Sequence, residues 1–227
     1  MFSRQRKGVC IAVGLAICIS LTGSHSSAVA AQHLWHVKEV FTNASGSVQF
    51  IEMFDSNFNE GFVGGFTLTA NSDGNIKTFR FPGNTSDTFN TNNHSLLIAT
   101  SGFGSLPGSV TPDFTFDQSA APNSPFVGPF FNPNATNITI TFSGSNDSMV
   151  FTGASLPKDG VKSLTDSGAF GNPPGSPNIS AGTNSPTNFN GTAGSVNLAP
   201  EPTTIACAVL GLGLLSMRRR SHRTRTG

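Results

Sequence analysis

Residues 48–54 read VQFIEMF, a stretch that is apolar at every position except Gln49 and Glu52. A short run rich in aromatic and β-branched residues favours a strand, and apolar side chains on both alternations suit a strand buried between two layers. The turn-forming run NASGS at 43–47 precedes the stretch, and a polar loop at 55–61 follows it. The stretch therefore predicts a strand inside a layered β-protein.

Short apolar runs separated by turn residues continue on both sides of this stretch. Asp73-Gly74 is a strong hairpin-turn signal, and ITITF at 138–142 alternates cleanly. Outside the two termini, no window of eleven or more residues has a helical apolar stripe. We expect strands over residues 33–41, 48–54, 62–70, 76–81, 95–100, 114–116, 138–142 and 149–152. Eight short strands in about 135 residues predict one all-β sandwich over residues 32–165.

The amino terminus has the order of a secretory signal peptide. Arg4, Arg6 and Lys7 precede an apolar stretch at 9–21, which is shorter than the about 20 residues of a membrane span. Small residues then follow, at which signal peptidase cuts. We expect residues 1–31 to be removed, with the cleavage site formed by Ala28 and Ala30.

Two alternatives exist for this terminus. One is a membrane anchor that is retained. The other is a lipoprotein modified at Cys18, but bulky Ile17 stands where that processing needs a small residue.

The carboxy terminus combines three features in a fixed order. A Pro-Glu-Pro motif comes first, an apolar run at 205–217 follows, and an arginine cluster comes directly after this run. As a helix the run spans only about 20 Å, less than the about 30 Å hydrocarbon core, yet it can enter the inner membrane with the arginines on the cytoplasmic side. The residues concerned are Pro200, Glu201 and Pro202, and Arg218, Arg219 and Arg220.

This tail, residues 200–227, closely resembles the PEP-CTERM sorting signal. The resemblance implies that an exosortase, a membrane protease, cuts near the Pro-Glu-Pro motif and releases the protein outward. It also implies a Gram-negative-type bacterium, often one that makes exopolysaccharide, and a secreted or cell-surface location reached through transient anchoring in the inner membrane. An ordinary tail-anchor helix is the alternative.

Composition narrows what the remaining chain can do. The three cysteines, Cys10, Cys18 and Cys207, all lie in the terminal signals, so the mature chain has no thiol for a disulfide, a nucleophile or a metal site. Between residues 32 and 200, five basic residues face eleven acidic ones, a formal charge of −6. Nucleic-acid binding requires a basic patch and is therefore excluded. Residues 166–199 are dominated by Gly, Asn, Pro, Ser and Thr, which predicts a disordered linker.

A second resemblance concerns the β-rich region. The residues VKEVF at 37–41, QFIEM at 49–53, GGFTL at 64–68 and SLLIAT at 95–100 are similar to the opening of a lamin-tail-type domain. The resemblance implies an immunoglobulin-like sandwich with roles in interaction and tethering. Phe66 stands where that pattern often has Trp.

Oxygen donors alternate in the loop after residue 54. Asp55, Asn57 and Asn59 are spaced as in calcium loops, but Glu60 stands where the EF-hand pattern needs Gly and its final glutamate is absent. Calcium is thus a weak candidate cofactor, and a solvated loop is the alternative.

Few residues suggest catalysis. No Gly-x-Ser-x-Gly, P-loop, Gly-x-Gly-x-x-Gly or His-Glu-x-x-His motif occurs. Asp113 and Asp117 could form a glycosidase pair, but more often such acids flank a strand, here with Phe114 and Phe116 packed below. His33 and His36 have no evident third metal ligand.

We therefore assign no catalytic residue and expect a non-enzymatic structural or adhesion module. Phe58 and Phe62 could stack on sugar rings, although Phe in such a sandwich is usually core. Polysaccharide binding is the alternative function, and an enzyme of exopolysaccharide metabolism is the third.

Overall fold

A computed structural model describes residues 34–122, 128–145, 147–168 and 178–198. The predicted signal peptide with Ala28 and Ala30, and the sorting tail at 200–227, lie outside these residues. Within the described residues, no helix is long and apolar enough to cross a bilayer.

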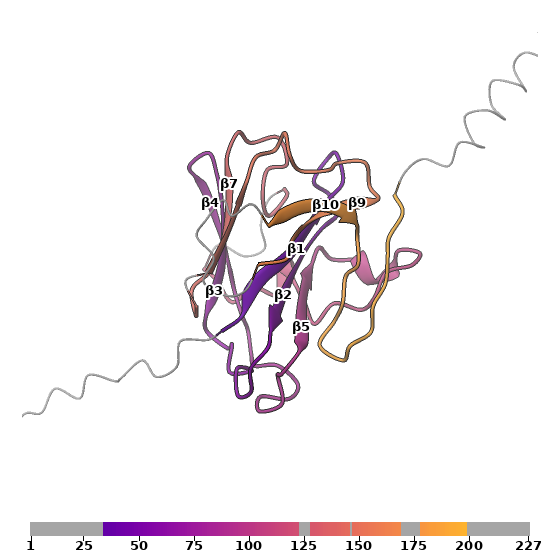
Figure 1. Ribbon diagram of the computed structural model, residues 1–227. Coiled ribbons are helices and arrows are strands. Elements are labelled where there is room, and N and C mark those ends of the chain that lie inside the picture. Colours follow the sequence, from indigo (N-terminus) through magenta and orange to yellow (C-terminus); the bar gives the residue numbers. More distant parts are fainter. Residues whose placement is uncertain (1–33, 123–127, 146, 169–177, 199–227) are drawn as a thin grey trace, which may run out of the picture. The chain divides into compact units, whose positions relative to one another are not determined.

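The described chain folds into two sheets (Figure 1). The six-stranded sheet has the order β10-β9-β1-β2-β5-β6, and the four-stranded sheet has the order β4-β3-β7-β8. Only the β5–β6 pair is parallel among the named strands. The strands are β1 His36–Thr42, β2 Gln49–Asp55, β3 Thr67–Ser72, β4 Asn75–Arg80, β5 His94–Ala99, β6 Phe114–Thr115, β7 Ile138–Phe142, β8 Asp147–Phe151, β9 Lys162–Asp166 and β10 Ile179–Thr183. The all-β prediction is confirmed, and all eight predicted strands are present.

The main core lies between the two sheets. Alternate residues of a strand point to opposite faces, so Ile51 and Met53 of β2 meet Leu68 and Phe142 of the facing sheet. Aromatic rings fill much of this core: the ring centroid of Phe81 lies 5.0 Å from that of Phe79 and 5.9 Å from that of Phe142. The predicted packing of Phe114 and Phe116 against this core is confirmed.

A second apolar cluster covers the other face of the six-stranded sheet. Phe41, Phe50 and Leu97 point away from the main core and are fully buried beneath the chain around Phe103 and Val196. Strand β2 is therefore buried on both faces, as its near-continuous apolar sequence predicts.

The predicted linker over residues 166–199 is wrong where the structure describes it. Strand β10 pairs with β9 in antiparallel register: Ile179 lies opposite Asp166 at one end, and Thr183 lies opposite Lys162 at the other. The chain beyond it, to residue 198, packs on the domain and buries Phe189 and Val196. Low apolar content does not prevent order here, because buried side chains of the sheet bond the backbone of this segment. The domain thus extends past residue 165.

Candidate functional site

The segment after β10 crosses the outer face of the six-stranded sheet, and we call residues 184–198 the strap. After β10, Figure 1 shows it as the orange-to-yellow chain beside β5. Its backbone N–H groups at alternate positions point to the sheet, as those of an extended chain do. Ser185 N donates to Glu39 Oε1 at 2.9 Å, Thr187 N to Glu52 Oε2 at 3.0 Å, and Phe189 N to Asp113 Oδ2 at 3.0 Å. Three carboxylates thus hold three alternate backbone N–H groups of the strap.

Glu39 and Glu52 are cross-strand neighbours on β1 and β2, and both are fully buried. Two like charges opposite one another repel, so each needs a partner. A register shift between Val37 and Glu39 marks a bulge at Lys38, whose ammonium lies 2.7 Å from Glu52 Oε1. Ser95 Oγ donates to the same oxygen at 2.6 Å. Burial raises the pKa of Glu52, and Lys38 opposes that shift.

The strap folds back on itself as a hairpin, and the side-chain amide of Asn184 joins its two ends. Its return arm pairs with the outgoing arm through Gly194 N and Pro186 O at 2.9 Å, and with the domain through Ser195 N and Gly108 O at 2.8 Å. Asn184 accepts from Val196 N at 2.8 Å and donates to Val196 O at 2.7 Å. The two arms are therefore fixed to each other and to the sheet.

The two aspartates considered for glycosidase chemistry have different surroundings. Asp113 is held beneath the strap, where burial raises its pKa to about 6 against the opposing hydrogen bonds from Leu97 N and Phe189 N. Asp117 is exposed on a single 3-10 turn, where hydroxyl hydrogen bonds from Thr115 and Ser101 lower its pKa. Asp113 positions the backbone of the strap.

The loop considered for calcium uses its carboxylate for a turn. Asp55 Oδ1 accepts from Asn57 N at 2.9 Å, the hydrogen bond of an Asx turn. Asn59 adopts a left-handed backbone with φ 67°, and its N–H bonds Phe89 O at 2.9 Å. Asp55 Oδ2 is buried without a hydrogen-bond partner, and burial raises the pKa of Asp55. Across the described residues, no three His, Cys, Asp or Glu side chains are grouped to hold a metal.

A groove of about 480 Å³ lies over β1, β2 and β9 of the six-stranded sheet. His36, Lys38 and Phe54 line it together with Asp166 from β9. The Lys38 ammonium lies 5.5 Å from the Phe54 ring centroid while bonding Glu52, so this cation already has partners. Burial lowers the pKa of His36, with nearby Asp147 and Asp166 opposing the shift. His33 lies outside the described residues.

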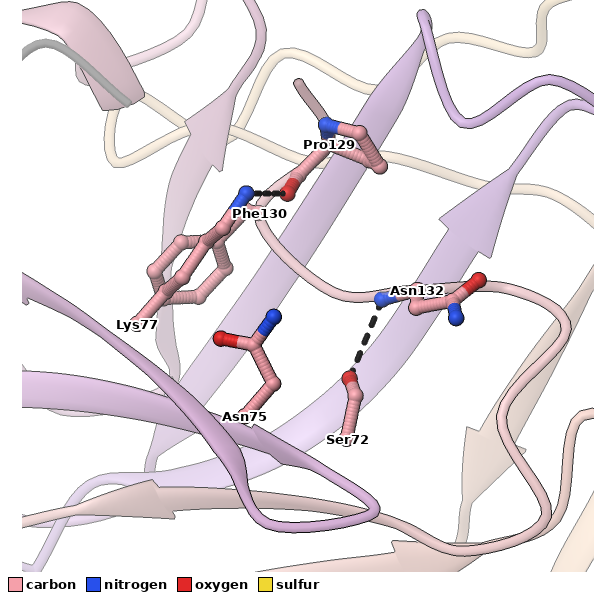
Figure 2. A pocket seen from close by; sticks show the side chains of 6 residues that line it. All are labelled: Ser72, Asn75, Lys77, Pro129, Phe130 and Asn132. Carbon is pink, nitrogen blue, oxygen red and sulfur yellow. Dashed lines mark hydrogen bonds between the residues drawn. The ribbon is translucent and has the colours of Figure 1, made fainter. Parts of the chain in front are cut away.

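A smaller hollow of about 230 Å³ separates the β3–β4 hairpin from residues 129–132 (Figure 2). Lys77 Nζ donates to Pro129 O at 2.6 Å, and Asn132 N donates to Ser72 Oγ at 3.0 Å. Its volume falls below the about 300 Å³ at which small-molecule pockets begin. These bonds tie residues 129–132 to the hairpin.

Three large aromatic side chains are exposed at one end of the sandwich, and we call Phe58, Phe62 and Phe89 the aromatic surface. Their exposed fractions are 57%, 44% and 63%. Sequence reasoning considered Phe58 and Phe62 but took core as the usual position, and it missed Phe89. The rings of Phe62 and Phe89 meet edge to face with centroids 5.5 Å apart. The aromatic surface is therefore a candidate interaction site.

Comparison with known proteins found no matching family model, no matching curated protein and no matching solved structure. The site must therefore be interpreted from its own chemistry.

Proposed function

We propose that this chain is an exported cell-surface or extracellular-matrix protein that acts as a non-enzymatic structural or adhesion module. The observation that carries the proposal is the strap. Buried carboxylates that could have served catalysis instead bond the strap backbone, and this favours a structural role for them.

The position of the strap also fits the proposed processing. Leu198 N bonds Gly160 O at 2.9 Å, so the chain is still docked on the domain two residues before Pro200. The residues that lead into the sorting motif are thus part of the domain, and in the proposal a cut near Pro200 leaves them on the released protein.

The immunoglobulin-like, lamin-tail-like character of the sandwich is part of this proposal. What supports it is the path of the first strands. Strands β1 and β2 form a hairpin in one sheet, β3 and β4 form a hairpin in the other, and β5 returns beside β2. Tethering and interaction are the roles that this likeness suggests.

Export and sorting rest on the terminal sequences. In the proposal, signal peptidase cuts next to Ala28 and Ala30. The apolar run at 205–217 then holds the chain transiently in the inner membrane, and an exosortase cuts near Pro200, Glu201 and Pro202. The arginines at 218–220 stay on the cytoplasmic side.

The test is mass spectrometry of both ends of the protein, taken from surface and membrane fractions of the native host. We expect a carboxy terminus near Pro200 in the surface fraction. Replacing Arg218, Arg219 and Arg220 by Ala should leave unprocessed chain in the cell, whereas the matched change of Arg223 and Arg225 to Ala should not. An intact terminus at Gly227 in the membrane fraction of the wild type would overturn the proposal.

A second candidate function, binding of exopolysaccharide, is favoured by one observation. The aromatic surface is solvent-exposed on two loops that are hydrogen-bonded to each other.

A further inference from the structure

The aromatic surface is built on two loops, residues 56–64 and 84–93, that are fixed to each other by backbone hydrogen bonds. Asn59 N donates to Phe89 O at 2.9 Å, Gly61 N to Thr88 O at 3.1 Å, and Thr85 N to Gly61 O at 3.0 Å. A side chain also joins the two loops: Thr91 Oγ1 accepts a hydrogen bond from Glu60 N at 3.1 Å and donates one to Asn57 O at 2.7 Å. The three phenylalanines are thus held on a preformed surface.

The same loops are anchored to the domain. The indole of Trp35, which is fully buried, donates to Glu60 O at 2.7 Å, and Leu34 N donates to Glu60 Oε2 at 3.1 Å. A preformed site loses little conformational entropy on binding. Exposure of three large apolar rings on a rigid support therefore points to a ligand.

The charge and polarity of the loops define the class of ligand. Residues 56–64 and 84–93 contain Glu60 and Asp87 and have no Lys or Arg. Anionic ligands, including acidic lipid headgroups and uronic acid polymers, are repelled or gain no partner here. Exposed amides lie on the same two loops instead, at Asn59, Asn90 and Asn93. Amides both donate and accept hydrogen bonds, which matches the hydroxyl groups of a sugar.

Aromatic faces provide the remaining contact. The face of a phenyl ring is electron-rich, and the C–H groups on one face of a pyranose carry partial positive charge. Rings set edge to face, like Phe62 and Phe89, offer surfaces in two planes to consecutive sugar units.

The location of the aromatic surface fits presentation away from the cell. Leu34, which bonds Glu60 of the aromatic loops, comes just before β1. Asn43, just after β1, is bridged to Asp159. The next residue, Gly160, accepts a hydrogen bond from Leu198 N at the end of the strap. The seven residues of β1 separate these positions by about 20 Å. The aromatic surface and the end of the strap thus occupy opposite ends of β1, as Figure 1 shows for the yellow end of the chain and the loops along the lower edge.

We infer that Phe58, Phe62 and Phe89 form a binding surface for a neutral polysaccharide. This inference rests on the proposed function, because an exported protein is the kind that meets such a polymer. The surface lies at the end of the domain that points outward if the tail is anchored.

The test is native affinity electrophoresis of the processed protein purified from its host. Gels contain dextran, laminarin or galactomannan as neutral probes, or alginate as an anionic one. We expect at least one neutral probe to retard the protein, and Phe62→Ala and Phe89→Ala each to weaken binding about tenfold, as loss of a central aromatic contact does. Ile76→Ala is the matched control, since Ile76 is 62% exposed on β4, and it should leave binding within about twofold.

A second pair of variants separates stacking from general apolar contact. Phe62→Trp should keep binding, whereas Phe62→Leu, which is apolar without a ring, should lose it. The emission of Trp35, the single tryptophan of every variant except Phe62→Trp, checks that the loop at Glu60 is intact in those variants.

Several results would overturn the inference: no retardation by any neutral probe, retardation by alginate alone, or unchanged binding in the Phe62→Ala/Phe89→Ala double variant. Binding to phosphatidylglycerol vesicles, or a dimer that Phe62→Ala dissociates, in place of glycan binding, would assign the surface to a membrane or to a second copy. Mapping the carboxy terminus and surface fraction of the same variants distinguishes the two proposals, because correct sorting with no glycan binding would reject this inference alone.

Discussion

The backbone N–H of Thr187 lies 3.0 Å from a carboxylate oxygen of Glu52, a residue 135 positions earlier in the chain. The other oxygen of the same carboxylate receives the Lys38 ammonium and the Ser95 hydroxyl. Because Glu52 is fully buried on β2, this single side chain joins the strap, the bulge of β1 and the start of β5.

Glu52→Ala should therefore destabilise the domain strongly. The change leaves the Ser95 hydroxyl and the Thr187 N–H without their partner, and removes the counter-charge of Lys38. We expect a loss of about 2–4 kcal/mol in the free energy of unfolding, measured by urea denaturation. Asp117→Ala, at an exposed carboxylate, is the control and should cost less than about 1 kcal/mol. Equal unfolding midpoints for Glu52→Ala and the wild type would show that the strap contact carries no stability.

Two glycines near the aromatic surface give a second matched pair. A Cβ at Gly61 would lie 2.5 Å from the Cα of Thr88 and 2.8 Å from the carbonyl oxygen of Asp87, both rigid backbone atoms. A Cβ at Gly83 would have nothing within 4 Å. Gly61→Ala should force the two hydrogen-bonded loops apart and lower the free energy of unfolding by about 1–3 kcal/mol. Gly83→Ala should leave it unchanged or raise it by up to about 1 kcal/mol.

Thermal unfolding of the two variants provides the measurement. If Gly83→Ala lowers the melting temperature as much as Gly61→Ala does, the close approach of the two loops is not what makes Gly61 necessary.

The strands that were predictable from the sequence carry a clear physical signature. ITITF at 138–142 alternates apolar and polar residues, and VQFIEMF combines apolar faces on both sides, so their type follows from side-chain partitioning alone. Strands β9 and β10 lack this signature. KSLTD has one large apolar residue and ISAGT has one, so their place in the sheet depends on backbone pairing. Strand β9 pairs with β1, which is distant in sequence, and β10 then pairs with β9.

The strap could not be predicted for a related reason. Its order depends on Glu39, Glu52 and Asp113, whose bonding partners in the strap lie 76 to 146 residues later in the sequence. Only the folded sheet brings these carboxylates to the strap. One signal was present: a glutamate inside an otherwise apolar, doubly buried strand requires a partner. For the aromatic surface no such signal exists, because composition does not distinguish exposed Phe58, Phe62 and Phe89 from core phenylalanines.

Calcium should leave the stability of the protein unchanged. Asp55 Oδ1 is occupied by the N–H of Asn57, and no cluster of acidic side chains stands beside it in the described residues. A site with a Kd of about 1 mM would add about 1 kcal/mol at 5 mM calcium and raise the melting temperature by a few degrees. We expect identical melting curves in about 5 mM calcium and in EDTA. If calcium raises the melting temperature of the wild type but not that of Asp55→Asn, the loop does bind calcium and this prediction is wrong.

Asp113 should make the stability of the domain depend on pH in an unusual direction. Its pKa rises from 3.8 to about 6 because burial beneath the strap disfavours the charged carboxylate. Between these values the folded protein retains a proton that the unfolded chain has released. The stabilising contribution is therefore complete below pH about 4 and is lost as the pH rises through about 6. Carboxyls of Glu52 and Asp147, whose pKa values burial also raises, act in the same direction, while His36, whose pKa burial lowers, acts in the opposite one.

Subtracting the profile of Asp113→Asn from that of the wild type isolates this contribution, since the other groups titrate in both proteins. The wild type should lose about 1–3 kcal/mol relative to the variant between pH 4.5 and pH 7.5, measured by urea unfolding at each pH. The amides of Leu97 and Phe189 favour the charged form and set the lower end of this range. Parallel profiles would mean that Asp113 titrates alike in the folded and unfolded chain. In that case the strap would not shield it from water, and its closure over the sheet would have to be looser than the hydrogen bond from Phe189 implies.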